Sequence, residues 1–116
     1  MTVLMMDVIK DAGGAPFADP ASDEHGQRLV FGPVVAEAVI GIGRFLRKSI
    51  ILTCIVNGQR TMSLLETELP LKVGSVEQGR ALLGYFLRDH IPREFQPAWL
   101  SRSRELDGLL PWRCQL

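Results

Sequence analysis

The sequence SIILTCIVNGQRTMSLLETE, residues 49–68, contains two runs suited to β-strands, joined by Asn57 and Gly58. Asn-Gly is the pair favoured in a two-residue type I′ turn, because both central residues of that turn need positive φ angles. The stretch therefore predicts an antiparallel β-hairpin over 49–68. This hairpin decides the fold class, because it requires an antiparallel sheet against which the rest of the chain must pack.

The turn also predicts the register and the place of each strand in the sheet. A two-residue loop sets Val56 opposite Gln59 and Cys54 opposite Thr61. The first run is apolar on both faces, which is typical of a central strand. The second run carries charged and hydroxyl side chains, which favour a position near the edge.

Residues 29–47, LVFGPVVAEAVIGIGRFLR, are compatible with two structures. Pro33, directly after a glycine, suits the first position of a helix. However, valine and isoleucine dominate the residues that follow, and Gly41 and Gly43 would weaken a helix interior. We therefore favour a strand or bent strand for the glycine-containing half.

Two further predictions concern the N-terminal part of the chain. Residues 2–9, TVLMMDVI, are short and apolar and are interpreted as a strand, although methionine and leucine suit a helix equally well. Residues 11–27, DAGGAPFADPASDEHGQ, are rich in glycine, proline, alanine and aspartate, and they predict a long flexible loop.

Two helices are predicted in the C-terminal part. Ser75 and Gln78 form a capping-box pattern, and the apolar spacing after them predicts a helix over 76–90. Pro92 disfavours helical geometry at the residue before it, so this helix should end there. A second helix is expected over 97–107, opened by a proline and stopped by a glycine.

These elements predict an α+β fold in a single domain, residues 1–116. A chain of 116 residues is long enough for one hydrophobic core and too short for two. The small antiparallel sheet would be covered on one face by the two C-terminal helices. Because the first strand of the hairpin is apolar on both faces, its second face must also be buried, and we predict a homodimer.

Composition argues against several classes of function. The 13 basic residues balance the 13 acidic ones, so no overall positive field draws the protein onto nucleic acid or an anionic membrane. The longest uncharged apolar run, SIILTCIV, is far shorter than the ~20 residues that span a bilayer. Cys54 and Cys114 form neither a disulfide framework nor a metal-binding pair, which is typical of a reducing compartment. We therefore expect a cytoplasmic protein without a membrane segment.

The segment RDHIPREFQPAW, residues 88–99, gathers side chains that suit a binding site. Arg88, His90 and Arg93 are the candidate ligand-binding residues, at the mouth of a pocket predicted between the sheet and the helices. The arginines and aromatic residues would also suit a nucleic-acid surface. Carboxylates cancel the positive charge over 88–107, however, so nucleic-acid binding is the less favoured alternative. A purely structural role for His90, at the C-terminal end of the helix, is favoured over a functional one.

No catalytic residue, metal site or cofactor is predicted. Asp89 and His90 are sequence neighbours, and neighbours on a helix point about 100° apart, so they cannot pair directly. Cys54 lies within an apolar strand, which is typical of a small buried hydrophobic residue rather than of a nucleophile. The acidic residues of 11–27 match no metal-binding spacing.

The sequence therefore favours a non-catalytic protein that acts through protein–protein interaction, such as an adaptor, an inhibitor or a regulatory subunit. Its contact surface would be the acidic segment 11–27 or the arginine-rich segment 88–104. One alternative is a small-molecule-binding domain or small enzyme with its pocket near His90. Another is nucleic-acid binding through the C-terminal half.

Overall fold

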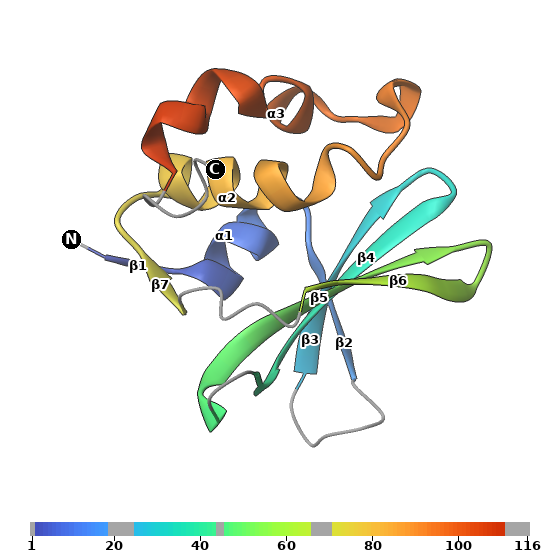
Figure 1. Ribbon diagram of the computed structural model, residues 1–116, viewed down its shortest axis with the longest axis horizontal. Coiled ribbons are helices and arrows are strands. Elements are labelled where there is room, and N and C mark those ends of the chain that lie inside the picture. Colours follow the sequence, from blue (N-terminus) through green and yellow to red (C-terminus); the bar gives the residue numbers. More distant parts are fainter. Residues whose placement is uncertain (1, 19–24, 44–45, 66–70, 111–116) are drawn as a thin grey trace.

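The computed structural model describes residues 2–18, 25–43, 46–65 and 71–110, which form an α+β fold (Figure 1). Its strands are β1 (Val3–Leu4), β2 (Ala15–Ala18), β3 (His25–Phe31), β4 (Val34–Ile42), β5 (Lys48–Val56), β6 (Gln59–Leu65) and β7 (Lys72–Val73). Its helices are α1 (Met5–Asp11), α2 (Val76–Leu87) and α3 (Ala98–Ser101), with the 3₁₀ helices η2 (Arg93–Phe95) and η3 (Ser103–Leu109). Strands β2 to β6 form an antiparallel sheet in sequence order, and β1 pairs with β7.

The predicted hairpin is confirmed. Asn57 and Gly58 have φ angles of 54° and 77°, as a type I′ turn requires, and β5 lies between β4 and the edge strand β6. The predicted pairing of Cys54 with Thr61 is wrong, because Cys54 pairs with Met62. The register shifts between Cys54 and Ile55, so Thr61 is the extra residue of a β-bulge. No pattern in the sequence predicted this bulge.

Residues 29–47 are confirmed as strand over most of the part that the structure describes. Gly32 and Pro33 form the turn between β3 and β4, and Gly32 has a φ angle of 62°. Pro33 therefore lies in a turn rather than at the start of a helix. The β-branched residues after it belong to β4, where they pack well on a pleated surface.

Two N-terminal predictions require correction. Only Val3 and Leu4 of residues 2–9 form a strand, because α1 begins at Met5. Three apolar side chains of this helix recur at positions i, i+3 and i+4 and are fully buried: Met5, Val8 and Ile9. The predicted loop 11–27 instead contains a strand pair, because β2 begins at Ala15 and pairs with β3, which begins at His25. Residues 19–24 of this segment lie outside the described part.

The helices pack on one face of the five-stranded sheet, as predicted (Figure 1). Helix α1 contacts both α2 and β3, and η3 packs along α2. The core between the layers takes alternate side chains from the strands, including Leu29, Ala36, Ile50, Leu52 and Cys54. Among the described residues, no helix combines the length and the apolar composition needed to cross a membrane.

Local sequence signals account for the limits of α2. The hydroxyl of Ser75 accepts a hydrogen bond from the Gln78 backbone nitrogen at 3.0 Å, so the predicted N-cap is present. The Gln78 side chain accepts from Gly74 at 2.6 Å, one residue before the position of a standard capping box. The helix ends at Leu87, slightly earlier than predicted.

The predicted helix 97–107 is instead two shorter elements. Helix α3 ends at Ser101 after one turn, and the chain continues from Ser103 as the 3₁₀ helix η3. Leu100 of α3 is fully buried, and Trp99 and Leu106 pack partly against the core. The prediction of one continuous α-helix over 97–107 was therefore wrong.

Candidate functional site

Residues of the segment 88–104 line a pocket of about 610 Å³ that is open to solvent on one side. All of its lining residues come from the end of α2, the connection through η2, helix α3 and the start of η3. Ile91 and Leu100 contribute apolar side chains, and three arginines contribute positive charge: Arg88, Arg93 and Arg104. This volume lies within the range of small-molecule sites in proteins.

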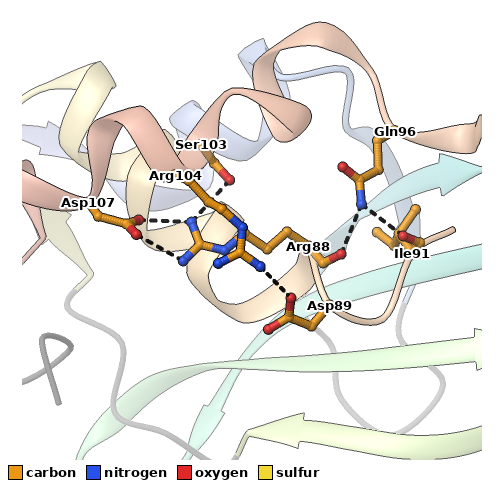
Figure 2. A network of polar contacts seen from close by, with 7 residues as sticks. All are labelled: Arg88, Asp89, Ile91, Gln96, Ser103, Arg104 and Asp107. Carbon is orange, nitrogen blue, oxygen red and sulfur yellow. Dashed lines mark hydrogen bonds and ion pairs between the residues drawn. The ribbon is translucent and has the colours of Figure 1, made fainter. Parts of the chain in front are cut away.

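Arg88 is the most firmly held of these arginines (Figure 2). It donates from both terminal nitrogens to the two carboxylate oxygens of Asp107, at 2.8 and 3.1 Å, and one of these nitrogens also contacts the Ser103 hydroxyl at 3.4 Å. The Arg88 side chain is only 9% exposed, and that of Asp107 is 41% exposed. The hydrogen bond from Arg88, aided by the positive charges of Arg88 and Arg104, holds the pKa of Asp107 below its ordinary value of 3.8.

A second ion pair and an amide complete this network (Figure 2). Arg104 donates to Asp89 at 3.0 Å, and both side chains are about two thirds exposed. The amide nitrogen of Gln96 donates to the backbone carbonyls of Arg88 and Ile91, at 2.9 and 2.8 Å. Gln96 therefore ties the loop after α2 back onto the end of that helix.

The structure separates the three residues predicted to bind a ligand. Arg88 and Arg93 line the pocket, whereas His90 is exposed and is not part of its lining. The pocket also lies within the C-terminal corner rather than between the sheet and the helices. Arg104 also lines the pocket; it belongs to the arginine-rich segment 88–104 but was not among the three predicted ligand-binding residues.

The aromatic residues of this segment have structural roles. Trp99 packs against Phe31 with ring centroids 6.3 Å apart, and the Phe95 ring covers Gly32 in the β3–β4 turn so closely that a Cβ atom there would clash. These contacts dock the C-terminal corner onto the sheet. Nucleic-acid binding remains an alternative prediction.

The outer face of the sheet, opposite the helices, is the second candidate surface. Its side chains form three rows across the strands. Cross-strand pairing aligns the first apolar row, Val30, Val35 and Ile55. Phe17, Val39 and Ile51 form the other apolar row, in which Gly26 makes room for the Phe17 ring.

A buried carboxylate lies in the row between them. Glu37 accepts from Arg28 at 2.7 and 3.2 Å and from Arg60 at 3.0 Å, and its side chain is only 8% exposed. The Arg28 guanidinium also lies 4.6 Å from the centroid of the Phe17 ring, a cation–π geometry. Sequence reasoning missed this cluster, although a glutamate on the same face of an apolar strand as Val35 was a visible signal.

Cys54 is a free, buried thiol on the core face of β5, and burial raises its pKa to about 11. Because the thiolate is the reactive form, roughly one thiol in a thousand would be ionised at pH 8. In a Cys114→Ser variant, we expect Cys54 to react with a disulfide reagent at least about 100-fold more slowly in the native protein than in denaturant. Equal native and denatured rates would contradict its placement in the core.

Within residues 2–18, 25–43, 46–65 and 71–110, no three histidine, cysteine, aspartate or glutamate side chains gather in a metal-binding group. The acidic residues Asp19, Asp23 and Glu24, like Cys114, lie outside these ranges. Comparisons with protein-family models, curated proteins and solved structures gave no match. The functional interpretation therefore depends on the geometry of this chain alone.

Proposed function

We propose that this protein is a non-catalytic cytoplasmic protein that acts through protein–protein interaction, as an adaptor, an inhibitor or a regulatory subunit. Its contact surface would be the outer face of the sheet, and its first partner a second copy of the chain. The observation that carries this proposal is the apolar surface on that face, where Val30 is 66% exposed and its row neighbours Val35 and Ile55 are partly exposed. The buried free thiol of Cys54 is consistent with a reducing compartment.

The arrangement in rows favours a second copy as the partner. Two copies could pack face to face about a two-fold axis that lies in the interface and runs along the Glu37 row. The row containing Val30 in one protomer would then contact the row containing Val39 in its partner, and the reverse. The net charge of the chain is zero, so two copies approach each other without overall repulsion. Arg28 and Arg60 are 44% and 61% exposed and would lie near the interface, with hydrogen-bond donors left for polar contacts.

Sedimentation velocity over a wide range of concentrations, including low micromolar, tests this proposal. We expect a dimer for the unmodified chain. The substitution Val30→Asp should raise the dimer dissociation constant at least about tenfold, because it places a carboxylate in a contact that must be desolvated.

The matched control is Leu109→Asp, which introduces the same charge at another exposed apolar side chain, in η3 of the helical layer. This variant should dimerise like the unmodified protein. A monomer at every concentration would rule out the second copy as the partner. Equal weakening by both substitutions would rule out the outer face as the contact surface.

A further inference from the structure

The pocket at 88–104 has more positive charge than the side chains of the described residues neutralise. Three arginines and one aspartate line it. Arg93 is exposed and forms no ion pair with any side chain that the structure describes. Arg88 is nine-tenths buried, and its Nε atom has no hydrogen-bond acceptor among the described residues. The unpaired guanidinium of Arg93, beside the positive potential of Arg88 and Arg104, favours an anionic ligand in this pocket.

We propose that this pocket binds a compact aliphatic polyanion carrying phosphate or carboxylate groups. Guanidinium groups suit such ligands because their planar forks donate two parallel hydrogen bonds to phosphate or carboxylate oxygens. Ile91 and Leu100 lie at the apolar floor of the pocket and are almost fully buried, so a ligand would contact mainly the polar side chains around them. Among the described residues, no aromatic side chain lines the pocket, so this part of the chain offers no stacking surface for a nucleotide base. The site therefore suits a sugar phosphate or a di- or tricarboxylate better than a nucleotide.

The arginines have different roles in this site. Arg93, whose guanidinium forms no ion pair with a described side chain, binds the anion directly. Arg104 binds the anion in place of Asp89. This replacement is possible because the Arg104–Asp89 ion pair is exposed to solvent and therefore weak. Arg88 stays paired with Asp107 and contributes positive potential from a fixed position. Gln96 is a positioning residue, because its amide holds the loop that carries Arg93.

Calorimetric titration with pyrophosphate and with citrate, at constant ionic strength, tests the inference. We expect saturable binding of at least one of these probes. Arg93→Ala and Arg104→Ala should each weaken it at least about tenfold, the effect of one lost charge-assisted hydrogen bond. Asp89→Asn should strengthen it, because this substitution removes the carboxylate that competes for Arg104.

The matched control is Arg102→Ala, which removes an exposed arginine of the same segment that does not line the pocket. This variant should bind as tightly as the unmodified protein. The inference goes beyond the proposed protein–protein interaction, and the dimer-interface variant Val30→Asp should also bind the probe normally. Failure of both probes to bind, or equal weakening by Arg93→Ala, Arg104→Ala and Arg102→Ala, would overturn it.

Discussion

Replacing Gly84 by leucine should destabilise the protein by about 3 kcal/mol or more. Gly84 lies in the C-terminal half of α2 and is buried against η3. A Cβ atom at this position would clash with the Cβ and Oγ atoms of Ser103, which is itself fully buried. A leucine would therefore separate α2 from η3. Urea unfolding at equilibrium measures the effect.

Two further variants establish the cause. Gly108 lies in η3, and an added Cβ atom there meets no other atom within 4 Å, so Gly108→Leu should change stability by less than about 0.5 kcal/mol. Gly84→Ala should cost about 1–2 kcal/mol, since the clash is partly offset by the better helix propensity of alanine. Adding Ser103→Gly to Gly84→Ala should recover part of this loss. Equal stability of the Gly84→Leu and Gly108→Leu variants would contradict the packing described here.

The sequence was sufficient for features with a local cause. Asn57-Gly58 specifies its turn through φ angles, and Ser75 starts α2 through a hydrogen bond three residues away. The assignment of 2–9 as a strand failed because methionine and leucine suit a helix as well as a strand. The i, i+3, i+4 spacing of Met5, Val8 and Ile9 favoured a helix, but the segment was too short for this periodicity to decide.

The candidate site was less predictable because its contacts are not local. Arg88 was identified from composition, but its partner Asp107 lies 19 residues further along the chain, and α3 and η3 must bend to bring the two together. The docking of Phe95 on Gly32 joins segments more than 60 residues apart. A single sequence contains no signal for such pairings. The sequence therefore showed which side chains could bind a ligand, but not which of them already form ion pairs or packing contacts within the fold.

Replacing Asp107 by asparagine should destabilise the protein by about 2–3 kcal/mol, the second-largest effect that we expect. The reason is the burial of Arg88, because a nine-tenths buried guanidinium would lose the carboxylate that compensates its charge. The exposed pair in the same corner provides the control. Asp89→Asn should cost less than about 0.5 kcal/mol, since water already surrounds both Asp89 and Arg104. Equilibrium unfolding at neutral pH compares the two variants.

A double substitution separates a lost attraction from an uncompensated charge. Arg88→Met keeps an apolar stem and removes both the buried charge and the unpartnered Nε donor. If the uncompensated charge is the main cost, the Asp107→Asn, Arg88→Met double variant should be more stable than Asp107→Asn alone. A double variant that is less stable than Asp107→Asn would show that the attraction itself dominates.

The same pair predicts how stability depends on pH. The pKa of Asp107 in the folded protein lies below its ordinary value of 3.8, so the folded state holds the ionised form more strongly than the unfolded state does. The stabilisation is therefore fully present well above pH 3.8 and is lost as the pH falls through the folded pKa. Asp107→Asn should remove this component, so the stability difference between the two proteins should shrink as the pH falls below about 4. A difference independent of pH would mean that the Asp107 carboxylate does not stabilise the fold through its charge.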